Sequence, residues 1–131
     1  MRGKAHTPSR STQARDFSGL RYGKITPTDL DAMIEYKDSG WVLIEVKADE
    51  NEMPFGQKLA LERLCDDLEK TKPTLLIVAK HHNSIDEDID FAGATVTAYR
   101  YKGSWYPDKR QTDYIGKDVK CLVDWFIEWL G

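Results

Sequence analysis

The sequence predicts a single α/β domain in which a mixed β-sheet is covered by helices. Residues 74–80, TLLIVAK, form a short continuous apolar run, which is typical of a central strand buried on both faces. Residues 117–130 repeat apolar side chains at helical spacing, which predicts an amphipathic helix. The expected order of elements is strand, strand, helix, strand, strand, strand, helix, and such an order favours a mixed sheet with helices packed on it.

Length and composition fit one globular domain without a membrane span. The chain has 131 residues, of which 40% are hydrophobic and 31% charged. It contains no apolar run of about 18 residues, and its first residues lack the apolar core of a secretory signal, so no membrane role is expected. Cys65 and Cys121 lie far apart in predicted helices without metal-ligand spacing. We expect them to be reduced core residues of a cytoplasmic protein.

Charge is distributed unevenly along the chain. Residues 1–24 hold six basic residues and one acid, a net charge of +5, so the remainder carries −8 of the total of −3. Residues 1–14 are expected to be a basic flexible arm, and residues 15–131 the domain. A basic arm favours contact with nucleic acid, or else it only solubilises the terminus. The candidate contacts are Arg10, Arg15, Arg21 and Lys24.

The remaining elements follow from turn residues and periodicity. A short helix is possible over residues 12–20. Strands are expected over 30–36 and 41–47, joined by the turn KDSG, and an acidic loop over 49–52. Pro54 opens a helix over 57–70, and Pro73 ends it. Residues 81–93 are expected to be a loop, and 94–101 to form a hairpin with 105–106 through KGS.

The first hairpin places charged residues together. In WVLIEVK the alternation of a strand puts Trp41, Leu43, Glu45 and Lys47 on one face. A three-residue DSG loop closed by a left-handed glycine at position 40 would pair position 37 with position 41, and hence residue 31 with residue 47.

Asp31, Glu45 and Lys47 would then converge at the end of the hairpin away from its turn. Two adjacent carboxylates repel unless a cation lies between them. A hard divalent ion suits such a pair. The other interpretation is a cross-strand ion pair of Asp31 with Lys47 on a solvated face.

Gln57 extends this cluster. Leu61, Leu64 and Leu68 form an apolar stripe on the predicted helix, and one step of four residues back from Leu61 reaches Gln57. The amide is therefore expected at the start of the buried face, close to Lys47 after a short loop. A solvated glutamine at the start of a helix is the alternative.

These residues resemble the PD-(D/E)XK nuclease superfamily. Asp31 is followed by thirteen residues, then Glu45-Val46-Lys47 as the (D/E)XK element, then a helix with Gln57 and the strand TLLIVAK. The hairpin TDLDAMIEYKDSGWVLIEVK particularly resembles Holliday-junction-resolvase-like and phage-encoded members. The resemblance covers about residues 28–80.

The resemblance implies a restriction-endonuclease-like fold and a Mg²⁺-dependent endodeoxyribonuclease, with Mn²⁺ as a plausible substitute. Asp31, Glu45 and the Val46 carbonyl would bind the metal, Lys47 would orient the water and stabilise developing charge, and Gln57 would position the site. It further implies DNA as partner, junction or branched DNA as substrate, a homodimer, and the cytoplasm of a bacterial or phage-infected cell. The alternative is a non-catalytic nucleic-acid-binding or assembly module that keeps the fold.

The sequence departs from the family pattern in three ways. No proline directly precedes Asp31, so Asp29 is a rival ligand. Residues 1–24 contain no glutamate, although the first helix of the family often supplies one. The strand that usually precedes the motif aspartate is short or absent.

Three further motifs have simpler interpretations. His81 and His82 are adjacent and lack a second ligand pair, so a loop contact to substrate is expected rather than a metal site. Residues 86–90, DEDID, lack the glycine and glutamate of a calcium loop and predict a solvated acidic loop. The third motif is a set of aromatic residues that either stack on bases or form core or dimer contacts. They are Tyr99, Tyr101, Trp105 and Tyr106.

Overall fold

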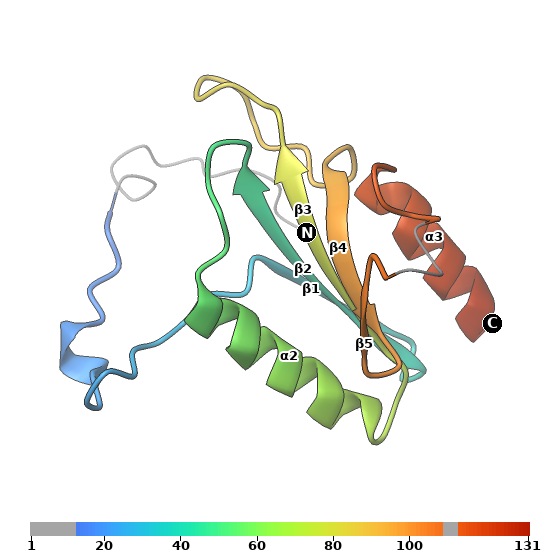
Figure 1. Ribbon diagram of the computed structural model, residues 1–131, viewed down its shortest axis with the longest axis horizontal. Helices are drawn as coiled ribbons and strands as arrows, with labels where there is room; N and C mark the ends of the chain where they lie inside the picture. The colour runs from blue at the N-terminus through green and yellow to red at the C-terminus, as the bar shows by residue number, and fades with distance from the viewer. Residues whose placement is uncertain (1–12, 109–112) are drawn as a thin grey trace.

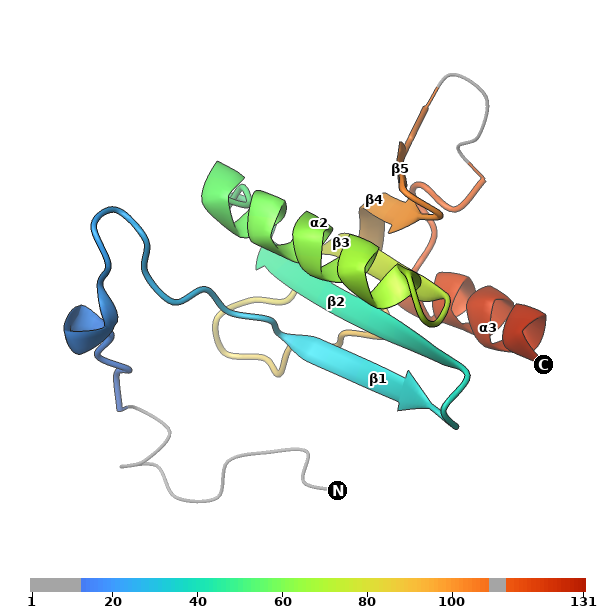
Figure 2. The same ribbon diagram turned by 90° about the horizontal axis from the view of Figure 1, so that it is seen from below.

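The computed structural model of the chain describes residues 13–108 and 113–131. Within them, five strands form one mixed sheet in the order β1-β2-β3-β4-β5 (Figure 1). The strands are β1 (Ala32–Tyr36), β2 (Gly40–Ala48), β3 (Thr74–His81), β4 (Thr95–Tyr101) and β5 (Ser104–Tyr106). Two helices, α2 (Phe55–Glu69) and α3 (Val119–Leu130), lie on opposite faces of the sheet (Figure 2). The expected α/β domain with a mixed sheet is confirmed, whereas the restriction-endonuclease-like fold stays a prediction.

The centre of the sheet is the parallel pair β2–β3, which α2 connects. Side chains at positions 75, 76 and 77 of β3 are fully buried, because alternate residues pack under α3 and under α2. Val42, Ile44 and Val46 of β2 pack on the α3 side, and Leu43 packs on the α2 side. The apolar run TLLIVAK is therefore a central strand, as its composition predicts.

The hairpin register differs from the expected one by two residues. Tyr36 pairs with Gly40, and Ala32 with Ile44, so the loop consists of residues 37–39. Lys37 and Asp38 adopt the left-handed conformation, with φ of 50° and 61°, whereas Gly40 is the first residue of β2. A shift of two keeps every side chain on its expected face because the side-chain period of a strand is two. Residue 31 therefore lies next to residue 45 rather than residue 47.

Helix α2 buries a slightly different stripe from the expected one. Its buried residues are Gln57, Leu61 and Cys65, while Leu64 is 41% exposed, so the expectation for Leu64 is wrong. Steps of four from Gln57 lead to Leu61 and Cys65, and the 3.6-residue period then carries the buried face to Leu68 rather than to Leu64.

Two other expectations are corrected in the described residues. Cys121 is exposed near the start of α3, although Cys65 is buried as expected. Only a short 3₁₀ turn, η1 (Ser18–Leu20), forms where a helix over 12–20 was possible, and residue 12 lies outside the described part. Most of the basic arm over 1–14 likewise lies outside it. Within residues 13–108 and 113–131, neither helix has the length and apolar content that a membrane crossing needs.

Gly40 is required by close packing and gives the first prediction. A Cβ atom at this position would lie 2.7 Å from Leu130 Cδ1 and 3.0 Å from the Pro73 carbonyl oxygen. We expect Gly40→Ala to lower the free energy of unfolding by about 1–3 kcal/mol, as overpacking does. Urea denaturation measures this, with Gly56→Ala as the matched control, because nothing lies within 4 Å of a Cβ there. Equal stability of the two variants would contradict the packing role.

Candidate functional site

The end of the hairpin brings the carboxylates of Asp31 and Glu45 together. Asp31 immediately precedes β1, and its backbone N–H donates to Glu45 Oε1 at 3.3 Å. In return, the Val46 N–H donates to Asp31 Oδ2 at 2.8 Å. Because the N–H and C=O of one strand residue point to the same edge of the strand, the Val46 carbonyl also faces the side of Asp31. The two acids are therefore adjacent, and the Val46 carbonyl lies on the same edge of β2 as the Val46 N–H that Asp31 binds.

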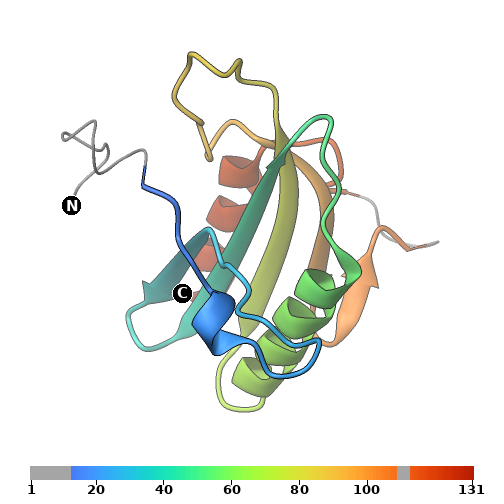
Figure 3. The same ribbon diagram turned by 90° about the vertical axis from the view of Figure 1, so that its left-hand side faces the viewer.

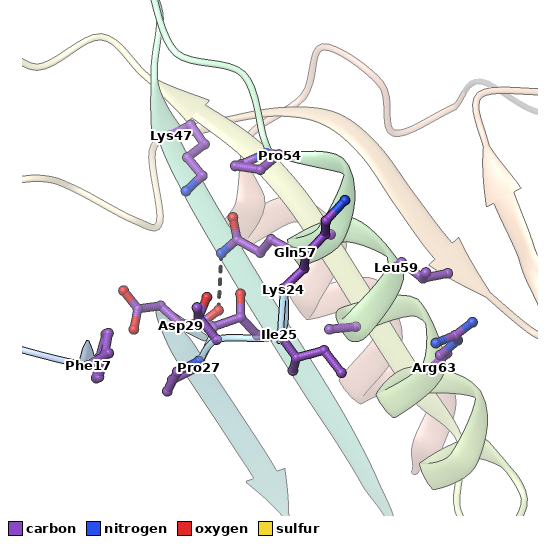
Figure 4. A pocket seen from close by; sticks show the side chains of 14 residues that line it. Phe17, Lys24, Ile25, Pro27, Asp29, Lys47, Pro54, Gln57, Leu59 and Arg63 are labelled. Atoms are coloured by element: carbon purple, nitrogen blue, oxygen red, sulfur yellow. Dashed lines mark hydrogen bonds between the residues drawn. The ribbon is translucent and has the colours of Figure 1, made fainter. Parts of the chain in front are cut away.

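Glu45 is held by donors from its own strand and from α2. The residue is only 1% exposed, although it carries a carboxylate. Gln57 Nε2 donates to Glu45 Oε2 at 2.7 Å, and Lys47 Nζ lies 3.1 Å from the same oxygen. Gln57 Nε2 also lies 3.1 Å from the backbone oxygen of Asp29, the hydrogen bond drawn in Figure 4. The amide therefore ties α2, β2 and the segment before β1 together.

The pKa of the Glu45 carboxyl is raised above its usual range. The main cause is burial, which removes the charged form from water, and the negative charge of Asp31 acts in the same direction. Hydrogen bonds from Lys47 and Gln57 oppose the rise. A cation bound beside Glu45 would favour its charged form against this cost of burial.

A groove with a volume of about 620 Å³ opens beside these residues. The segment over 24–29 forms one wall, the first two turns of α2 form the other, and Lys47 lies at the end between them (Figure 4). Lys24 and Arg63 add positive charge to the walls. The groove is large enough for a small ligand or for part of a polymer backbone.

The other sequence candidates fall into different places. Asp29 forms an ion pair with Arg15 at 2.9 Å, and Figure 4 shows its carboxylate directed away from Gln57. The rival ligand thus has a partner of its own outside the cluster. Arg21 is exposed, Lys24 lines the groove, and Arg10 lies outside the described residues.

The histidines contact residues outside this cluster, and the acidic loop over 86–90 is exposed, as expected. His82 contacts Asp49 Oδ2 at 2.6 Å and Thr95 Oγ1 at 2.9 Å, whereas His81 Nδ1 accepts from the Asn83 N–H. Within the part of the chain that the structure describes, no three His, Cys, Asp or Glu side chains are grouped so that they could hold a metal ion. The carboxylate pair of Asp31 and Glu45 is accordingly a two-acid site.

The sequence analysis did not identify two further lysines near Lys47, on the side of Lys47 that faces β3 and β5. Lys80 pairs with Lys47 in the parallel register of β2 and β3, and Lys58 lies over the ring of Trp105 at 4.9 Å. A signal for Lys80 was present, because WVLIEVK and TLLIVAK both end in lysine and parallel pairing aligns such ends. No comparable signal places Trp105, whose position depends on the fold of β5 against α2.

No family model, curated protein or solved structure matches this chain in comparisons with known proteins. The function is therefore inferred from the geometry of the site and from the resemblance of its motif.

The raised pKa of Glu45 predicts a pH-dependent cost in stability. The folded chain binds a proton at Glu45 more tightly than the unfolded chain does, so stability falls as pH rises from about 4.3, the ordinary value, through the raised pKa. We expect Glu45→Gln to be more stable than the wild type at neutral pH without metal, with the difference vanishing at low pH.

Urea denaturation across this pH range measures the effect. Glu69→Gln is the control, because burial also raises the pKa of the Glu69 carboxyl. In this variant the pH-dependent loss of stability that comes from Glu45 should remain. A difference between Glu45→Gln and wild type that does not change with pH would show that Glu45 ionises as freely in the folded chain as in the unfolded one.

Proposed function

We propose that this protein is a divalent-metal-dependent nuclease that hydrolyses phosphodiester bonds in DNA. The observation that carries the proposal is the convergence of Asp31, Glu45, Lys47 and Gln57, three from the hairpin and one from α2, around one carboxylate pair. The same residues carry the resemblance to the PD-(D/E)XK superfamily. Structure-selective cleavage of branched DNA by a homodimer, in the cytoplasm of a bacterial or phage-infected cell, is the more specific form of the proposal.

The donor set fits a hard cation such as Mg²⁺ or Mn²⁺. A carboxylate has about four lone-pair sites. From the described residues, Glu45 receives donors from Asp31, Gln57 and Lys47, and Asp31 receives one from Val46, so both retain acceptor capacity. Two carboxylates with a backbone carbonyl and waters form a typical magnesium environment. A bound ion of this kind lowers the pKa of a coordinated water and polarises a phosphate.

Lys47 has a second task once a cation is bound. Without one, its ammonium group neutralises Glu45 across 3.1 Å. With a cation held by Asp31 and Glu45, the Lys47 ammonium would be free to contact a phosphate in the groove. Its side chain is 26% exposed and lines the groove, so it can reach a ligand without rearrangement of β2. There it would orient the attacking water and stabilise negative charge in the transition state.

The alternative is a non-catalytic nucleic-acid-binding or assembly module, and one observation favours it. Glu45 is almost completely buried and already hydrogen-bonded, which is also what a purely structural polar cluster requires. The two proposals differ in whether the carboxylates take up metal and whether Lys47 affects bond cleavage.

Substitution of Lys47 separates them. We expect Lys47→Ala to lower Mg²⁺-dependent cleavage of DNA by about 10²-fold or more, as loss of one charge-stabilising group does, while DNA binding is kept. Cleavage is measured on linear duplex, single strand, flap and four-way junction. Lys70→Ala is the matched control, since Lys70 is an exposed lysine at the far end of α2 that pairs only with Asp67 among the described residues. Full cleavage activity in purified Lys47→Ala protein would overturn the proposal.

A further inference from the structure

A second cavity opens on the other flank of α2 and shares Lys47 with the groove. Its volume is about 210 Å³, and its walls come from the segment before α2, the first turn of α2, the second half of β3, the middle of β4, and β5. Figure 3 shows α2 between the segment that precedes β1 and the strand β5, so the two spaces lie on opposite sides of the helix. Lys47 is the residue at which they adjoin.

The side chains of the second cavity combine positive charge with one aromatic ring. Lys58 and Lys80 line the second cavity together with Lys47, and Trp105 of β5 forms another of its walls. Glu52 is the acid in its wall, but it is 90% exposed and contacts Lys80 at 3.3 Å, so it screens that lysine weakly. Lysines around an aromatic ring are the combination that binds unpaired nucleotides, through the phosphate and the base respectively.

Trp105 is held in a fixed orientation. Its indole N–H donates to Glu62 Oε1 at 2.6 Å, and the guanidinium of Arg100 lies 5.7 Å from the ring centre. Arg100 is itself fixed by two hydrogen bonds to Asp66 of α2. The ring is thus preorganised, and the exposed Lys58 is the contact that a base could displace from it.

Trp105 also differs from the other aromatic residues of β4 and β5. Tyr99 stacks on Tyr106, and Tyr101 packs against Trp125 of α3, so these rings belong to the core on the α3 side. Trp105 alone among them packs on the α2 side, the side of Glu45 and Lys47. The core expectation holds for the three tyrosines, and the base-stacking expectation remains for Trp105.

We propose that this cavity binds one unpaired nucleotide next to the phosphate that Lys47 contacts. The base stacks on Trp105, and Lys58 and Lys80 contact the flanking phosphate. The cavity is smaller than the roughly 300 Å³ of ordinary ligand pockets, so it takes a single base and not a duplex. The inference rests on the proposed nuclease function and assigns its substrate class, which is DNA with a single-stranded segment at the cleavage point.

Binding of two DNA probes tests the proposal. The probes are a flush-ended duplex and the same duplex with a short thymidine overhang, and fluorescence anisotropy with a chelator present measures affinity without cleavage. We expect wild type to prefer the overhang probe by about tenfold. Trp105→Leu should lose this preference and Trp105→Phe should keep most of it, because both lose the bond to Glu62 but only phenylalanine keeps a stacking face.

The lysines are tested by salt dependence. Lys58→Ala should flatten the fall of log affinity with log salt for the overhang probe by about 0.7, one phosphate contact to a single strand, whereas Lys70→Ala should not. Circular dichroism confirms that each variant is folded. If folded Trp105→Leu keeps the preference for the overhang probe, the nucleotide site at Trp105 is overturned. Mg²⁺-dependent cleavage of the flush duplex would in that case still support the nuclease proposal. Absence of both binding and cleavage in wild type overturns both proposals.

Discussion

The buried carboxylate of Glu45 is the constraint on which the rest of the structure depends. A charge that is 1% exposed is costly unless donors surround it. Those donors come from three parts of the chain: the backbone before β1, the side chain of Lys47 in β2 and the amide of Gln57 in α2. The hydrogen bonds and the ion pair to Glu45 therefore fix the start of the hairpin, the position of α2 against the sheet and the position of Asp31. The same contacts form the candidate site, so its geometry is built into the folding of the hairpin and of α2.

The order of elements and the faces of the strands could be predicted from the sequence, because both follow from hydrophobic periodicity. The register of the hairpin could not be predicted. The sequence KDSG suggests that its glycine lies in the turn, whereas in the structure Gly40 is the first residue of β2. Lys37 and Asp38 supply the left-handed residues, and Gly40 is needed where Leu130 and Pro73 approach the backbone. That requirement comes from the packing of α3 and of the α2–β3 connection, which no local pattern records. The exposure of Leu64 and Cys121 has the same origin, because a helical period defines a face but not how widely that face is covered.

The sequence predicted which residues of the candidate site lie together, because strand alternation places their side chains on one face. Asp31, Glu45, Lys47 and Gln57 were grouped correctly because a two-residue error in register preserves parity. Their contacts differ from the expected ones, since Lys47 pairs with Glu45 and Asp31 is bridged to Val46. The second cavity was accessible only in part. The lysines that end WVLIEVK and TLLIVAK indicate the parallel alignment of Lys80 with Lys47. The packing of Trp105 on the α2 side depends on how β5 folds against α2, and no pattern within one segment predicts it.

Paramagnetic broadening by Mn²⁺ tests most directly whether the carboxylate pair is a metal site. In an amide NMR spectrum of the metal-free protein, substoichiometric Mn²⁺ should selectively broaden the signals of Asp31 and Val46, and Mg²⁺ in excess should restore them. The same titration of Asp31→Asn should leave these signals sharp, while the acidic loop over 86–90 reports non-specific binding in both proteins. Broadening confined to that loop, or equal in wild type and variant, would contradict the central claim that Asp31 and Glu45 bind a divalent cation.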